Sequence, residues 1–136
     1  MKPDKKQLKK DYAQTPRPMG VFLIRNNHND KVFLGVSLDL PGIINRQKFA
    51  LRAGVHANKT LQSDWNELGS ESFAFEIVDE LPPRPGQAVD YRAELESLEN
   101  LWLERLQPFG ERGYNLPKLS RAERLRRIAA KRSDDG

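Results

Sequence analysis

The sequence predicts a small α/β domain, in which helices pack on three strands. Two runs of β-branched and aromatic residues, 20–25 and 32–36, are separated by a turn-forming segment, which indicates a β-hairpin. A third run, 72–80, alternates its larger apolar side chains with the period of a strand. Three longer segments repeat apolar residues at helical spacing. The order of two strands, two helices, a strand and a helix is typical of one layered domain.

Length and composition fit a single domain that is expected to be cytoplasmic. The chain has 136 residues, of which 38% are hydrophobic and 31% are charged, and ~100–150 residues is the commonest domain size. No apolar run approaches the ~18–20 residues that cross a bilayer, and the charged N-terminus does not resemble a signal peptide. The absence of cysteine excludes disulfides and thiolate chemistry, and two histidines make a multi-histidine zinc site a poor prediction.

The hairpin runs are apolar on consecutive residues, so we expect both strands to be buried on both faces. Two helices are expected next, over 43–53 and 58–68, each ending at a glycine. The third strand is followed by a proline-rich loop and then by the longest predicted helix, 88–106.

Basic extensions are expected at both ends of this domain. We place the N-terminal extension at 1–18, with a short helix within it, the domain at 19–118, and a basic C-terminal segment at 119–136. A capping pair, Ser120 and Glu123, predicts a last helix from about residue 121.

Charge is distributed unevenly along the chain. The net charge is +4, and residues 1–10 and 118–136 each carry +4. Residues 17–59 carry +5, whereas residues 60–117 carry −8. A basic half beside an acidic half fits a surface that binds a polyanion next to one that binds a cation. The alternative is a solvated surface whose basic ends only aid solubility.

Several short motifs occur in a fixed order. Gly20-Val21-Phe22 is followed, after ten residues, by Phe33-Leu34-Gly35, and together they resemble the paired motif of the GIY-YIG nucleases. The resemblance covers about residues 19–118. It continues through His56-x4-Leu61-Gln62, Phe75–Leu81, Glu99–Leu103 and Gly113-Tyr114-Asn115. It implies a three-stranded antiparallel sheet flanked by helices, and cleavage of DNA with a divalent metal ion, Mg²⁺ or Mn²⁺.

The resemblance assigns roles to five positions. The metal-binding glutamate corresponds to Glu99, and the last asparagine of the motifs corresponds to Asn115. The two motif tyrosines correspond to Phe22 and Phe33, which have no hydroxyl, and the helix arginine corresponds to Ile43. Phenylalanine cannot titrate, so Phe22 and Phe33 are expected to be packing residues.

Glu99 also stands out from the residues alone. On a helical wheel it lies on the apolar face of the longest helix, beside Leu95, Trp102 and Leu103. A carboxylate there is costly unless it is paired or coordinates a cation, and one carboxylate with phosphate oxygens and water is a usual way to hold magnesium. The alternative is a partly exposed glutamate paired with an arginine.

Other candidates would take over the missing functions. Arg46 lies one helical turn after Ile43 and could bind phosphate, or be an ordinary surface arginine. His56, in the turn between helices, would assist a metal-activated water or be an exposed loop histidine. Lys31 would contact phosphate or be a strand-end lysine. Asn115 would bond the backbone near Glu99, contact substrate or be structural. Further phosphate contacts are expected from Lys48, Arg52, Arg124 and Arg127.

Two functions therefore remain open. One is a metal-dependent phosphodiesterase that acts on DNA, with Glu99 holding the metal. The other is a nucleic-acid-binding or regulatory module that has kept the scaffold and lost the reaction. DNA is the expected partner and RNA the alternative; no membrane partner is expected, and the sequence does not indicate an oligomeric state.

Overall fold

A computed structural model describes residues 17–117 and, beyond them, residues 122, 125–126 and 128–129. The expected N-terminal helix lies outside the described residues, as do Arg124 and Arg127 of the expected C-terminal helix. No helix in the described part of the chain is long and apolar enough to cross a membrane.

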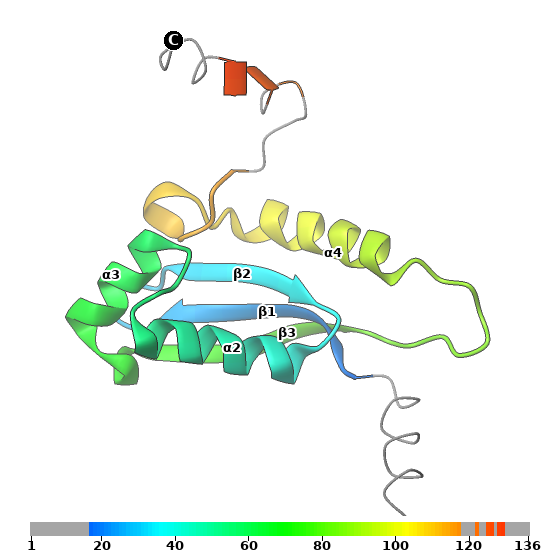
Figure 1. The fold of residues 1–136 in the computed structure, drawn as a ribbon, viewed down its shortest axis with the longest axis horizontal. Coiled ribbons are helices and arrows are strands. Elements are labelled where there is room, and N and C mark those ends of the chain that lie inside the picture. Colours follow the sequence, from blue (N-terminus) through cyan, green and yellow to red (C-terminus); the bar gives the residue numbers. More distant parts are fainter. Residues whose placement is uncertain (1–16, 118–121, 123–124, 127, 130–136) are drawn as a thin grey trace, which may run out of the picture.

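The described chain forms one antiparallel sheet with the strand order β2-β1-β3, which confirms the predicted fold class (Figure 1). The elements follow the predicted order. They are β1 (Met19–Asn26), β2 (Val32–Ser37), α2 (Leu40–Ala53), α3 (Lys59–Leu68), the 3-10 turn η1 (Ser70–Ser72), β3 (Phe73–Leu81), α4 (Tyr91–Leu106) and the 3-10 turn η2 (Gly110–Arg112).

The central strand β1 divides the core in two. Phe22 and Ile24 pack toward α2 and α3 on one face of the sheet, whereas Val21 and Leu23 pack toward α4 on the other (Figure 1). Burial on both faces is therefore confirmed for β1. It is wrong for β2, which is an edge strand with only Val32 and Leu34 fully buried.

Two helices begin at positions other than those expected, because side-chain caps set their first turns. Helix α2 begins at Leu40 instead of residue 43, since Asp39 Oδ1 accepts a hydrogen bond from the Gly42 amide at 3.1 Å. Helix α4 begins at Tyr91 instead of residue 88, since Asp90 caps it. The predicted ends of α2, α3 and α4 are confirmed.

The motif glycines allow close packing between strands. Gly35 lies opposite Phe22 in the β1–β2 ladder, and a Cβ atom at Gly35 would lie 2.6 Å from the Phe22 ring. Gly20 has a φ of +154°, and a Cβ there would lie 2.0 Å from the Asp79 carbonyl oxygen of β3. A side chain at either position would displace the strands or the core ring.

The segment after η2 pairs with the outer edge of β2. The Tyr114 amide donates to the Val32 carbonyl at 2.9 Å. The Asn115 side chain then bonds both backbone groups of Leu34: its Oδ1 accepts from the amide at 2.8 Å and its Nδ2 donates to the carbonyl at 2.9 Å. These bonds place Asn115 and Leu116 at the second of the two cavities described below.

Candidate active site and the neighbouring groove

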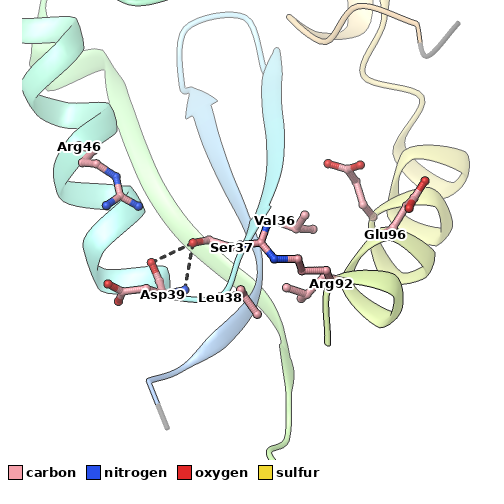
Figure 2. Close-up of a pocket in the computed structure, with 9 residues that line it drawn as sticks. Val36, Ser37, Leu38, Asp39, Arg46, Arg92 and Glu96 are labelled. Carbon is pink, nitrogen blue, oxygen red and sulfur yellow. Dashed lines mark hydrogen bonds between the residues drawn. The ribbon is translucent and has the colours of Figure 1, made fainter. Parts of the chain in front are cut away.

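A pocket of about 430 Å³ lies at the end of β2 and is lined from one side by α2 and from the other by α4 (Figure 2). We call it the Glu99 pocket. Figure 2 shows Arg46 approaching from α2, and Arg92 and Glu96 from α4. The lining residues are Val36, Ser37, Leu38, Asp39, Arg46, Arg92, Leu95, Glu96 and Glu99.

Glu99 lines this pocket and is half-buried. Its helix is anchored by the buried Leu95 and Leu103, which turn this side of α4 toward the sheet. Glu96 lies three residues earlier and so shares the same face of the helix. The predicted position of Glu99 beside the strands is thus found, and Glu96 adds a second carboxylate that the sequence analysis did not select.

Asp39 and Ser37, at the rim of the pocket, have structural roles. Asp39 caps α2 and forms an ion pair with Arg17 at 2.8 Å. The bond from the Gly42 amide, with help from Arg17, holds the pKa of Asp39 below its usual value. The Ser37 hydroxyl donates to the Asp39 carbonyl at 3.1 Å and accepts from the Asp39 amide at 3.0 Å. The other charged groups of the pocket are two carboxylates and two guanidinium groups.

Arg46 is an exposed side chain of α2 that lines the pocket, as its predicted role requires. The ion pairs of the described residues include neither Arg46 nor Arg92. Ile43, one turn earlier, packs instead against the core next to Phe22. The guanidinium of this helix therefore lies one turn away from the position that the motif comparison assigns to it.

The donors in the pocket suit a hard divalent cation that keeps much of its hydration. Nowhere in the described residues do three or more carboxylates or histidines gather as a metal site. Glu96 and Glu99 alone line the pocket as carboxylates without a capping role. Mg²⁺ and Mn²⁺ accept such a site, because one or two carboxylates with water and substrate phosphates complete their coordination.

A second cavity, of about 620 Å³, borders the first one along β2. We call it the His56 groove. Arg46 lines both cavities. The complete lining consists of Phe33, Ile43, Arg46, Gln47, Ala50, Val55, His56, Ala57, Asn58, Asn115 and Leu116.

His56 is buried, at 4% exposure, so the alternative of an exposed loop histidine is wrong. Its Nδ1 accepts from the Asn58 amide at 3.0 Å. In the neutral ring the proton therefore lies on Nε2, which donates to Gln47 Oε1. Burial lowers the pKa of His56. Both ring nitrogens are engaged, and the histidine lines the groove and not the Glu99 pocket.

The two motif phenylalanines occupy different environments. Phe22 is a core residue at 2% exposure, as predicted. Phe33 lies 6.5 Å from it between ring centroids and lines the groove, where its ring meets the His56 ring edge-on at 5.7 Å. Neither position supplies a group that can transfer a proton.

The remaining predicted residues lie away from the Glu99 pocket. Lys31 lies over the Tyr114 ring at 5.9 Å, just before the start of β2, while the pocket lies at the other end of that strand. Lys48 lies over the Phe75 ring at 5.1 Å, and it lines a separate hollow together with Arg52. Asn115 bonds the backbone of β2 and not the backbone near Glu99.

Sequence reasoning also missed a buried polar cluster around Tyr114. The hydroxyl of Tyr114 donates to Asp64 Oδ2 at 2.7 Å and accepts from Asn26 Nδ2 at 3.0 Å. Burial, with Asp64 beside it, raises the pKa of Tyr114 to about 12. The three residues come from distant parts of the chain, so no local pattern could reveal the cluster.

The chain matches solved structures in its fold. No protein-family model and no curated protein matches the sequence. The solved structures that match include the catalytic domain of homing endonuclease I-TevI, with 27% identity and a TM-score of 0.61, over 74% of this chain and 99% of that one. A mutant of the catalytic domain of intron endonuclease I-TevI matches with 25% identity and the same TM-score, over 76% and 97%.

The chain has the fold of the GIY-YIG nucleases. The match confirms the resemblance that the ordered motifs indicated. It supports a nuclease-type scaffold. Phe22, Phe33 and Ile43, which stand where the resemblance places functional side chains, pack in the core or line the groove.

Proposed function

We propose that this protein binds DNA and hydrolyses a phosphodiester bond with the help of a divalent metal ion held at Glu99. One observation carries the proposal: α2 and α4, which are separated in the chain by a helix and a strand, bring Arg46 and Glu99 to the same pocket. Such a pairing of guanidinium and carboxylate suits a phosphate bound together with its metal ion.

The side chains divide the work between them. Glu99, with Glu96 beside it, would hold Mg²⁺ or Mn²⁺. A bound metal ion supplies an activated water and neutralises phosphate charge. Arg46 and Arg92 bind the phosphate oxygens from opposite sides of the pocket, since they come from different helices. The basic segments at both chain ends add affinity that falls as salt rises.

A second candidate is a nucleic-acid-binding or regulatory module without catalysis. It is favoured because neither cavity, within the described residues, has a phenol or an imidazole with a free ring nitrogen. The motif phenols are absent, and the His56 nitrogens are both engaged in hydrogen bonds. On this reading the charged groups of the Glu99 pocket only bind phosphate.

Plasmid nicking distinguishes the two functions. The full-length protein is incubated with supercoiled plasmid and Mg²⁺ or Mn²⁺, beside Glu99→Gln and the control Glu104→Gln. Glu104 is an exposed residue of the same helix that does not line the pocket, so its loss tests the effect of charge alone.

The expected result is metal-dependent nicking that Glu99→Gln reduces at least ~100-fold, equivalent to about 2.7 kcal/mol, and that Glu104→Gln preserves. Salt-sensitive DNA binding without nicking would establish the binding module instead. If the protein neither binds nor nicks DNA, and a duplex RNA also fails to bind, both functions are excluded.

A further inference from the structure

We propose that the His56 groove receives one unpaired nucleobase of the DNA, next to the phosphate that Arg46 binds. The inference rests on the proposed function and names its substrate class: DNA in which a base is displaced, bulged or single-stranded. Both cavities share Arg46, so a backbone phosphate at that side chain places the attached nucleotide at the mouth of the groove.

The walls of the groove are suited to the flat face of a base. Phe33 contributes an aromatic ring, and Ile43 and Ala50 contribute aliphatic surface from α2. Val55 and Leu116 at the groove are large apolar side chains left 67% and 83% exposed. Unpaired bases are bound by aromatic and apolar side chains in this manner, and a volume of about 620 Å³ lies in the range of small-ligand sites.

The polar groups of the groove are almost all used by the protein itself. Asn58 donates to the Tyr114 carbonyl at 2.6 Å and accepts from the Leu61 amide at 3.0 Å. Asn115 is held by the backbone of β2, and both nitrogens of His56 are engaged. A ligand that needed several hydrogen bonds from this groove would find few of them.

One directed donor remains. Gln47 Oε1 accepts from His56, and this bond fixes the orientation of the amide, so Nε2 of Gln47 is left as a donor without a partner among the described residues. A nucleobase presents a carbonyl oxygen or a ring nitrogen that accepts such a bond. The combination of an arginine, apolar walls and one amide donor matches the phosphate, face and edge of one nucleotide.

A base in an intact duplex would have to leave its stack to enter, which costs a few kcal/mol. A base that is already unpaired avoids that cost. The groove should therefore make the protein prefer DNA with an unpaired base over the same DNA fully paired.

Binding of two oligonucleotides tests the proposal. Both carry 2-aminopurine at one position, which is an unpaired bulge in one duplex and is paired with thymine in the other. Affinity is measured by anisotropy, and occupation of the groove by the change in 2-aminopurine fluorescence. Ala57→Trp fills the groove, Val55→Glu places a carboxylate at its exposed wall, and Ala53→Trp is the control on an exposed residue of α2 outside the groove.

We expect the wild type to bind the bulged duplex about tenfold tighter than the paired one, with a fluorescence change on binding. Ala57→Trp and Val55→Glu should remove the preference, while Ala53→Trp should keep it. Equal affinity for both duplexes, or a preference that survives both groove variants, overturns the inference and leaves the proposed function standing. Failure to bind either duplex removes the proposed function together with it.

Discussion

The Glu99 pocket and the His56 groove lie side by side along β2 and share Arg46, yet they are built differently. The pocket presents carboxylates and guanidinium groups that are exposed or half-buried. The groove has apolar walls, and its histidine and asparagines are held in internal hydrogen bonds. A polar residue beside a cavity can therefore serve the fold instead of a ligand, and its internal hydrogen bonds show which of the two roles it has.

The largest effect that we expect is the loss of protein stability when His56 of the groove is removed. His56→Ala removes a buried ring that bonds Asn58 and Gln47, so it should lower the free energy of unfolding by about 2–4 kcal/mol. Glu99→Gln should change it by less than about 1 kcal/mol. Urea denaturation of both variants measures their free energies of unfolding. The prediction is wrong if Glu99→Gln is the more destabilising of the two.

Arg46→Ala should affect both cavities at once. Loss of the shared guanidinium is expected to weaken DNA binding about 10-fold. It should also reduce the slope of log affinity against log salt concentration by about 1, because one fewer counterion is released. Arg46→Lys should recover the salt dependence without all of the affinity, because an ammonium group cannot bind phosphate in a bidentate manner. Titrations at several salt concentrations measure this, and an unchanged slope in Arg46→Ala would remove Arg46 from the DNA contact.

Alkaline pH should test the Tyr114 cluster, which supports the groove through Asn58. The pKa of the Tyr114 hydroxyl is raised to about 12 in the folded protein from an unfolded value near 10. The folded state therefore holds the hydroxyl proton more tightly than the unfolded chain does. The stability that it contributes is complete below pH 10 and is lost as the pH rises toward 12. Unfolding curves of the wild type should show this loss, and those of Tyr114→Phe should lack it.

The smallest expected effect is at acid pH. Burial lowers the pKa of His56 in the folded state, so the unfolded chain binds that proton more readily. The contribution is complete above about pH 6.5 and is lost as the pH falls through the folded-state pKa. His56→Gln, although less stable, should show a flatter dependence of stability on pH as the pH falls below 6.5. A slope equal to that of the wild type would show that His56 is not the group responsible.

The sequence predicted the elements well wherever local patterns decide them. The β-branched runs located all three strands, and the glycines after α2 and α3 located the ends of these helices. The predicted starts of α2 and α4 are wrong, because the side-chain caps Asp39 and Asp90 set them and not the apolar spacing. The edge position of β2 was missed, because an apolar run does not reveal which strand is central.

For the site, helical spacing was enough to place Glu99 and Arg46 on the helix faces that line one pocket, while their roles stay predictions. Local reasoning failed for His56, because its burial depends on Gln47 from α2 and Gln62 from α3. Lys31 and Lys48 were grouped with the site by sequence proximity, although Lys31 lies before the far end of β2 and Lys48 lies over Phe75 of β3.

The bonds from Tyr114 and Asn115 to β2 also govern how the sheet can associate. An uncovered edge strand invites pairing with another chain. Between Val32 and Leu34 that edge is already hydrogen-bonded by the chain's own later residues. Strand addition from another chain is therefore expected at the opposite margin, β3, none of whose residues lines the Glu99 pocket or the His56 groove.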